Sequence, residues 1–354
     1  DWIDGGAGDD FIDGGTSQSA TMGFSLNTVT YINAPNAVNV DLSKNLATGY
    51  GNDTLLNIEG IQDSKYNDTL IGDDKNNYFR LDGGGDDTVY GGDGQDDVWF
   101  ENANSGVFVN LITGIATDID KSHPYIGTDH LFSIEGVKGS YFSDYIQLGN
   151  KSSGVFGRAG DDTLIGGDSG ENFIGGSGND SIDGGGGVDQ VSYYDDAWDS
   201  GSGVYGSLGV NVNLEKGIAI DNWGDTDTLK NIENIYGSSL DDVLIGDSSN
   251  NRIEGQQGAD TLTGGKGADL FDYFGESSGV GKGNRDVITD FDPNSGDKIG
   301  LDGIANGNLK YQGIKPFSAI NQVRYQTDLV NAITLVQINL DNDLSNPEME
   351  IELT

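Results

Sequence analysis

Large apolar residues recur every nine positions over much of the chain. They fall at Ile146, Val155, Leu164, Phe173, Ile182 and Val191, and again at Leu244, Ile253, Leu262 and Phe271. A strict period of nine fits neither the 3.6-residue repeat of a helix nor a long two-residue alternation. It fits a three-residue strand followed by a six-residue turn. The pattern therefore predicts a solenoid of short strands whose apolar residues share one core.

The residues between these apolar positions follow the unit Gly-Gly-x-Gly-x-Asp-x-U-x, in which U is a large apolar residue. Clear copies begin at Gly91, Gly175 and Gly264. Glycine permits the positive φ angles and the close backbone contacts that a tight turn requires, and the Asp closes each turn with a carboxylate. An isolated Gly-Asp cluster would indicate only a turn, but runs in register on this scale indicate a repeat.

This unit resembles the hemolysin-type calcium-binding repeat of RTX proteins. The resemblance implies an all-β fold, a right-handed parallel β-roll or β-solenoid in which two nonapeptides form one coil. It also implies several Ca²⁺ ions between stacked turns, bound by the Asp carboxylates and by backbone carbonyls of the glycine-rich turns. Asn77, Glu171 and Asn251 take the Asp position elsewhere, so we expect those turns to bind weakly or to act as spacers.

Carried over position by position, the resemblance nominates the metal-binding residues. At the Asp position they are Asp10, Asp68, Asp87, Asp96, Asp144, Asp162, Asp180, Asp189, Asp242, Asp260 and Asp269, and at the preceding glycine Gly8, Gly85, Gly94, Gly160, Gly178, Gly187, Gly258 and Gly267.

Three longer segments interrupt the nonapeptides and resemble one another. Each opens with an alternating segment at Val38, Val107 or Val210, and each closes with an Ile-Glu pair ending at Glu59, Glu135 or Glu233. The alternation predicts half-buried strands, and we expect each insert to form a wider coil. We favour a purely structural role, although a cleft lined by their acidic residues could bind sugar or further calcium.

The nine-residue period stops after Phe271. The segment from Arg285 to Ile299 resembles the one that closes the β-roll in serralysin-type metalloproteases and other type I secreted proteins. A solenoid needs a cap because its last coil exposes an open edge and an apolar face. The resemblance also implies a secretion signal in the last residues. We therefore divide the chain into two insert-bearing repeat segments at 1–97 and 98–189, a third at 190–272, and the cap at 273–354.

The composition narrows the possible partners. The 58 acidic residues outnumber the 18 basic ones, for a net charge of -40. Such a chain repels phosphates, so nucleic acid is a poor candidate, whereas divalent cations would relieve the repulsion. The chain has no cysteine and no apolar run of membrane-spanning length. Its two histidines, His123 and His130, do not form a zinc-protease motif. We expect Trp2, Trp99, Trp198 and Trp223 to pack rather than to stack on sugars.

Together these features predict a non-catalytic, extracellular or cell-surface calcium-binding module that folds on meeting external calcium. It would support type I (ABC) secretion and the stability of a larger bacterial protein, and the sequence looks like a fragment because it begins inside a repeat. Two alternatives stay open. One is a surface or biofilm adhesin segment that touches extracellular polysaccharide, and the other is the C-terminal part of a secreted metalloprotease or an alginate-epimerase-like enzyme.

Overall fold

The computed structural model describes residues 1–15, 26–122, 124–194, 206–275, 277–301, 304 and 309–354, so His123 and Trp198 lie outside the described residues. The chain forms two compact units, residues Asp1–Gly175 with Gly184–Gly187 and residues Gly176–Asp183 with Val188–Thr354. Apart from the 3-10 helix η1 (Leu42–Lys44), the secondary structure that we describe consists of β-strands. In these described ranges no helix is long and apolar enough to cross a membrane.

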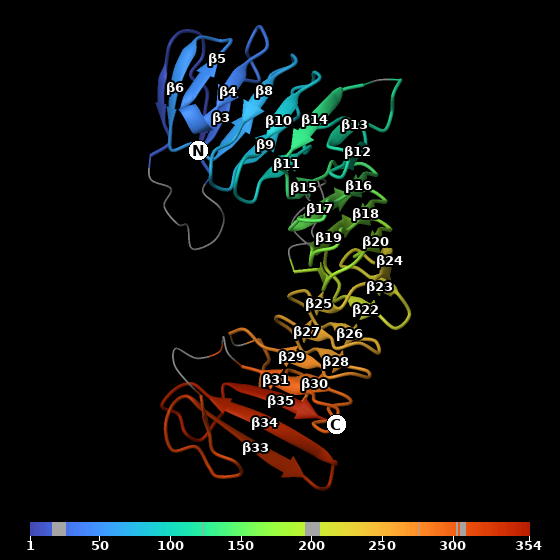
Figure 1. Cartoon of the computed structure of the whole chain (residues 1–354). Coiled ribbons are helices and arrows are strands. Elements are labelled where there is room, and N and C mark those ends of the chain that lie inside the picture. Colours follow the sequence, from blue (N-terminus) through green and yellow to red (C-terminus); the bar gives the residue numbers. More distant parts are fainter. Residues whose placement is uncertain (16–25, 123, 195–205, 276, 302–303, 305–308) are drawn as a thin grey trace. The chain divides into compact units, whose positions relative to one another are not determined.

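The first unit is built from two rows of short strands. Successive coils of the chain add their strands to these rows, as Figure 1 shows. One row, sheet A, is parallel and contains β1 (Trp2–Ile3), β3 (Thr28–Thr30), β7 (Gly60–Gln62), β9 (Tyr78–Arg80), β11 (Asp97–Trp99), β15 (Gly136–Lys138) and β17 (Gly154–Ala159). Sheet B contains β2 (Phe11–Asp13), β4 (Asn39–Asp41), β5 (Leu46–Thr48), β6 (Asn52–Leu56), β8 (Thr69–Ile71), β10 (Thr88–Tyr90), β12 (Val107–Asn110), β13 (Ile115–Asp118), β14 (Thr128–Phe132), β16 (Tyr145–Gln147) and β18 (Thr163–Ile165). Strand β19 (Asn172–Ser177) runs from the first unit into the second.

The second unit repeats this plan. Its sheet A strands are β21 (Gln190–Ser192), β25 (Asn234–Tyr236), β27 (Arg252–Glu254), β29 (Leu270–Asp272) and β31 (Lys298–Gly300). Its sheet B strands are β20 (Ser181–Asp183), β22 (Asn211–Asn213), β23 (Ile218–Ile220), β24 (Thr226–Lys230), β26 (Val243–Ile245), β28 (Thr261–Thr263), β30 (Asp286–Ile288), β32 (Lys310–Tyr311), β33 (Gln322–Asp328), β34 (Ile333–Asn339) and β35 (Met349–Leu353).

The nine-residue period places its apolar residues in the core, as the sequence predicts. Each coil uses two nonapeptides, so Ile253 pairs in parallel with Ile235 on one side and with Phe271 on the other. Every apolar position named above for the period is at most 1 % exposed. The fold is therefore all-β, a parallel β-roll with a core formed by the central residue of each short strand.

The three inserts differ from the wider coil that the sequence predicts. In the first insert β4, β5 and β6 pair antiparallel, while β4 also pairs in parallel with β8 and β6 with β2. The other two inserts, β12–β13–β14 and β22–β23–β24, have the same arrangement. Each insert thus folds back on itself and lengthens sheet B, because an alternating sequence specifies a strand but not the direction of its partner.

The C-terminal segment closes the second unit. Strand β35 pairs in parallel with β30, the last repeat-like strand of sheet B, and antiparallel with β34, which in turn pairs with β33. The Arg285 guanidinium ties this junction together, with ion pairs of 3.0 Å to Glu350 and 2.5 Å to Glu352. This antiparallel sheet covers the edge that the roll would otherwise leave open.

Candidate calcium-binding turns

A glycine at the first position of a repeat turn makes room for the carboxylate that closes the turn, although the turn ending at Asp87 has Asp82 at that position. A Cβ atom on Gly91 would lie 2.6 Å from Oδ2 of Asp96, and one on Gly255 would lie 2.1 Å from Oδ2 of Asp260. Real Cβ atoms do not approach oxygen so closely, so any other residue would displace the Asp. Glycine at these two positions therefore allows the Asp side chain to fold back under its own turn.

The fourth position of these turns requires glycine for a different reason. Its φ angle is positive at every nominated glycine, from 110° at Gly85 to 138° at Gly258, a region that other residues rarely adopt. Space is also short, because a Cβ on Gly267 would lie 2.2 Å from the carbonyl oxygen of Ser249 in the turn one coil back. We call turns with this geometry glycine turns. They end at Asp10, Asp87, Asp96, Asp162, Asp180, Asp189, Asp260 and Asp269.

The carboxylates of stacked turns form a ladder along each unit. Oδ1 of Asp87 accepts the backbone N–H of Asp68 at 2.7 Å, and Oδ1 of Asp260 accepts that of Asp242 at 2.9 Å. Asp162 and Asp269 accept the N–H groups of Asp144 and Asn251 in the same way. One oxygen of each of these carboxylates therefore holds neighbouring coils together.

The other oxygen of several glycine-turn carboxylates is buried without a hydrogen-bond donor. It belongs to Asp10, Asp87, Asp96 and Asp260. Because a buried carboxylate oxygen needs a donor, a proton of its own or a cation, these atoms are candidate cation ligands. Ca²⁺ fits such positions, since it binds carboxylate and carbonyl oxygens in flexible geometry.

Backbone groups would have to complete any metal site. Among the described residues, no group of three or more His, Cys, Asp or Glu side chains is placed to hold a metal ion. A zinc or magnesium cage of side chains is therefore not what these turns offer. A pair of stacked carboxylates supplemented by backbone carbonyls, which the resemblance to RTX repeats implies, agrees with this geometry.

Three nominated residues, Asp68, Asp144 and Asp242, lie in turns of another kind. Oδ2 of Asp242 accepts the N–H of Ser238 at 2.6 Å, and its Oδ1 accepts the Ser238 hydroxyl and the N–H of Val210, both at 2.7 Å. Asp68 has the same donors from Ser64 and Val38, and Asp144 from Ser140 and Val107. Protein donors thus surround both oxygens in these serine turns.

The backbone of the serine turns differs as well. The fourth residue is Tyr66, Phe142 or Leu240, and none of these has a positive φ angle. Its N–H instead donates to the serine hydroxyl, at 3.1 Å from Leu240 to Ser238. The turns with Asn77 and Asn251 are similar, because each asparagine oxygen accepts an N–H from its own turn, that of Asp73 or Asp247.

Burial raises the pKa of carboxylates in both kinds of turn, and it raises the pKa of Asp144, in a serine turn, to about 7. Burial, followed by the nearby Asp286, raises the pKa of Asp260 to about 9. Burial also raises the pKa of Asp242, but only to about 6, because hydrogen bonds from Ser238 and Val210 oppose the rise. In the first unit, burial raises the pKa of Asp87 to about 8 and that of Asp96 to about 7. Without a cation these carboxylates favour the protonated form.

The ladder contains members that the nonapeptide pattern does not nominate. Each insert supplies one Asp and one Glu. Asp53 and Glu59 of the first insert accept the N–H groups of Asp10 and Asn27, respectively. In the same order, Asp129 and Glu135 accept those of Asp87 and Asp96, and Asp227 and Glu233 accept those of Asp180 and Asp189. The cap supplies Asp286 and Asp297, which accept those of Asp260 and Asp269. The signal for the insert residues in the sequence is the recurring Asp-x-Leu-x-x-Ile-Glu segment, repeated at the same place in each insert.

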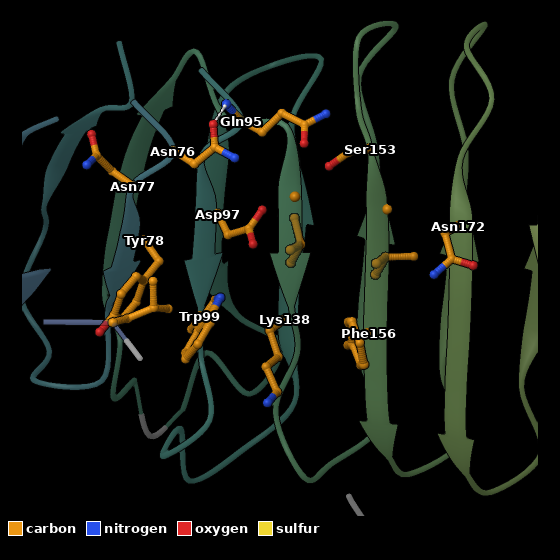
Figure 2. A pocket seen from close by; sticks show the side chains of 15 residues that line it. Asn76, Asn77, Tyr78, Gln95, Asp97, Trp99, Lys138, Ser153, Phe156 and Asn172 are labelled. Carbon is orange, nitrogen blue, oxygen red and sulfur yellow. Dashed lines mark hydrogen bonds between the residues drawn. The ribbon is translucent and has the colours of Figure 1, made fainter. Parts of the chain in front are cut away.

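The first unit also has a groove on the outer face of sheet A, with a volume of about 600 Å³. Figure 2 shows Trp99, Lys138 and Phe156 beside it, in register on β11, β15 and β17. Its polar lining includes Asn76, Gln95, Asp97, Ser153 and Asn172. Trp99 therefore lines this groove, stacked on Tyr78 at 4.7 Å between ring centroids.

Comparison with known proteins agrees with the geometry of the turns. Residues 1–17, 62–98, 81–104, 139–170, 165–196 and 236–271 match the family described as RTX calcium-binding nonapeptide repeat (4 copies). These segments contain every nominated aspartate, whereas the inserts and the C-terminal segment lie largely outside them. No match was found among curated proteins. These segments of the chain thus carry RTX calcium-binding nonapeptide repeats.

Proposed function

We propose that this chain is a non-catalytic module that folds when it meets extracellular calcium and thereby supports secretion and stability of a larger secreted protein. The observation that carries the proposal is the set of buried carboxylate oxygens without donors in Asp10, Asp87, Asp96 and Asp260. They recur at one position of the repeat, so a single type of cation site would explain all of them.

Repulsion between stacked carboxylates would make folding depend on calcium binding. Two like charges about 4 Å apart repel by about 4 kcal/mol at an effective dielectric constant near 20, so stacked carboxylates oppose the calcium-free roll. An ion that binds only the folded form adds its binding free energy to folding. Extracellular calcium modules bind at about 10⁻⁴ to 10⁻³ M, far above cytosolic calcium, so the chain would stay unfolded until it leaves the cell.

This timing suits a type I exporter, which we propose as the secretion partner. An unfolded chain passes through a narrow channel, and the antiparallel cap formed by β33, β34 and β35 would offer the first structured end on which repeats assemble outside. The support for this order is that β35 pairs directly with β30, the last repeat-like strand of sheet B.

Circular dichroism of the chain during calcium titration tests the folding proposal. We expect little β signal in EGTA, a cooperative gain at millimolar calcium and a much weaker response to magnesium, which keeps its water and demands an octahedral site. An identical β spectrum in EGTA and in calcium would reject the proposal.

Saccharide binding is a second candidate function, favoured by the groove over β11, β15 and β17. Gly136 and Gly154 line this groove without side chains, and the Asp97 carboxylate lies over Gly136, where a Cβ atom would be 1.9 Å from its Oδ1. The nearby cations Arg80 and Lys138 are paired with Glu101, at 2.9 Å each. Aromatic rings and amide groups with little free charge favour a neutral glycan over an acidic one.

A binding screen with neutral and uronic-acid oligosaccharides tests this candidate on the calcium-loaded chain. We expect weak binding of a neutral oligosaccharide that Trp99→Ala or Asn172→Ala abolishes, while Trp223→Ala in the second unit leaves it unchanged. Failure of every neutral oligosaccharide to bind, or equal binding by the Asn172→Ala variant, would exclude the groove as a saccharide site.

A further inference from the structure

The turn between the last two strands of the third insert is organised by the side chain of Asp221. This turn, residues 221–225, joins β23 to β24. Oδ1 of Asp221 accepts the backbone N–H groups of Trp223, Gly224 and Asp225, at 2.9, 2.7 and 2.8 Å. One carboxylate oxygen therefore fixes the backbone of the turn and leaves the other oxygen for a different partner.

Two buried oxygens of this turn have no hydrogen-bond donor. They are Oδ2 of Asp221 and Oδ1 of Asn222, and the two residues are 0 % and 1 % exposed. The NH₂ group of Asn222 donates to the carbonyl of Leu208 at 2.9 Å, which identifies the end of the amide that carries the oxygen. Burying a polar oxygen without a donor costs free energy of folding. These two neighbouring oxygens are therefore candidate ligands of a small cation.

The second insert supplies protein donors to the equivalent aspartate. Ile115-Ala116-Thr117-Asp118 corresponds to Ile218-Ala219-Ile220-Asp221 in the third insert. Oδ2 of Asp118 accepts three backbone N–H groups of its own turn, at 2.8 to 3.2 Å, and its Oδ1 accepts the hydroxyl of Ser105 at 3.2 Å. Both oxygens of Asp118 thus have donors, and no cation is needed there.

The residue in place of that serine explains the difference. Ser105 lies two residues before Val107, and Leu208 lies two residues before Val210 at the start of the third insert. Leucine has no hydroxyl to donate to Asp221. The first insert has Gly49 at the aspartate position, so it has no carboxylate there at all. The donorless oxygen is therefore a property of the third insert.

Negative charge surrounds Asp221. Burial raises its pKa, the N–H groups of Asp225 and Trp223 lower it, and the charge of Asp225 raises it further. Burial also raises the pKa of Asp227 to about 7, with contributions from the charges of Asp221 and Asp225. In the part of the chain that the structure describes, no ion pair involves any of these three aspartates. A divalent cation would relieve their repulsion.

We propose that the turn at residues 221–225 binds one Ca²⁺ ion through Oδ2 of Asp221 and Oδ1 of Asn222. Backbone carbonyls and water would supply the remaining oxygens, because calcium takes about six to eight oxygen ligands in flexible geometry. Asp227 contributes charge rather than a ligand, since its two oxygens accept the N–H of Asp180 and the hydroxyl of Tyr193. Neither ligand belongs to the ladder of stacked carboxylates, and both lie outside the segments that match the nonapeptide repeat.

The same substitution in two inserts tests the proposal by counting ions. Native mass spectrometry of the calcium-loaded full chain would give the number of bound ions, and circular dichroism would confirm folding. We expect Asp221→Asn to bind one ion fewer than wild type, because the amide keeps an oxygen for the N–H groups of the turn but loses the charge. Asp118→Asn is the matched control. Its NH₂ group can donate to the Ser105 hydroxyl, so the number of ions should not change.

Terbium luminescence locates the ion without altering a ligand. Tb³⁺ occupies calcium sites and emits when an excited tryptophan close to it transfers energy, and Trp223 lies within the turn. When tryptophan is excited selectively, Trp223→Phe and Asp221→Asn should each lower the terbium emission of the loaded chain. Asp118→Asn should retain the wild-type emission.

The results separate this site from the glycine turns. A folded Asp221→Asn chain with the wild-type number of ions would overturn the proposal, and so would undiminished terbium emission in Trp223→Phe. The second result decides if Asp221→Asn does not fold, because phenylalanine preserves the backbone donors of the turn. A wild-type chain that binds a single ion, lost in Asp221→Asn, would support this site and reject the function proposed for the glycine turns.

Discussion

The glycine turns and the serine turns solve the same problem, an aspartate buried at the end of a tight turn, by different means. In the serine turn at Asp242 the protein supplies three donors, whereas in the glycine turn at Asp260 one oxygen has none. A serine turn is therefore complete as a protein structure, and a glycine turn is complete only with a cation or a proton. The comparison shows that a shared Asp does not imply a shared need for calcium.

The inserts explain where serine turns occur. The N–H groups of Val38, Val107 and Val210, each at the start of an insert, donate to Asp68, Asp144 and Asp242. Each insert thus stabilises one side of the coil that follows it without calcium. Glycine turns and serine turns consequently both occur along each unit, and under the proposed function the serine turns would hold structure while the glycine turns await their ions.

Protons should substitute for calcium in the glycine turns, and we expect this to be the largest effect. The folded-state pKa values of Asp260, Asp87 and Asp96 are raised to about 9, 8 and 7. A raised folded-state pKa stabilises the fold below the unfolded value of about 4, and this contribution is lost as the pH rises through about 7 to 9. In EGTA the β signal should therefore increase when the pH falls from 9 to 5.

Thermal melts in EGTA across this pH range provide the measurement. At fixed calcium the same protons compete with the ion, so the calcium concentration at half-folding should rise as the pH falls. Calcium-free stability that grows with pH would contradict the role assigned to these carboxylates.

Removing one carboxylate from each kind of turn should sharpen the contrast. Asp260→Asn keeps an oxygen for the N–H of Asp242 but loses the charge, so it should bind fewer ions than wild type. The expected loss of stability is about 2.7 kcal/mol when calcium is at one hundred times its dissociation constant. In Asp242→Asn, the new NH₂ group would point toward N–H donors. This variant should therefore lose about 1 to 3 kcal/mol of folding stability, and the number of bound ions should not change.

Urea unfolding in saturating calcium, combined with ion counting, distinguishes the two variants. Equal loss of ions in Asp242→Asn and Asp260→Asn would mean that both kinds of turn bind calcium alike. The contrast between serine and glycine turns would then have no functional meaning.

Ser238→Ala should have the smallest effect. It removes the hydroxyl that donates to Asp242 at 2.7 Å and accepts the N–H of Leu240 at 3.1 Å, while the backbone donors to Asp242 remain. We expect about 1 kcal/mol less stability and no change in the calcium midpoint measured by circular dichroism. A shift of that midpoint comparable to the shift in Asp260→Asn would place calcium in the serine turn.

Much of the fold could be predicted because the nine-residue period is a purely local signal. Positions such as Ile253 and Phe271 are each the central residue of a three-residue strand, so their spacing alone specifies both the strand and the core. The inserts could not be predicted as fully. Their Val-x-Val alternation indicates strands, but whether β4 and β5 pair antiparallel depends on the turn between them and on contacts with β8.

The candidate site was predictable only to the level of residue type. Asp242 and Asp260 occupy the same repeat position, and what separates them is serine at the second position of the turn and Leu240 in place of glycine at the fourth. That signal is in the sequence, but its meaning depends on the donors that the folded turn brings together.

The most direct test of the account is an experimental structure of the chain in calcium, with anomalous scattering to locate the ions. The account predicts ions beside Asp96 and Asp260 in the glycine turns, and none beside Asp68, Asp144 or Asp242. Intact coils whose glycine turns contain no metal would contradict it.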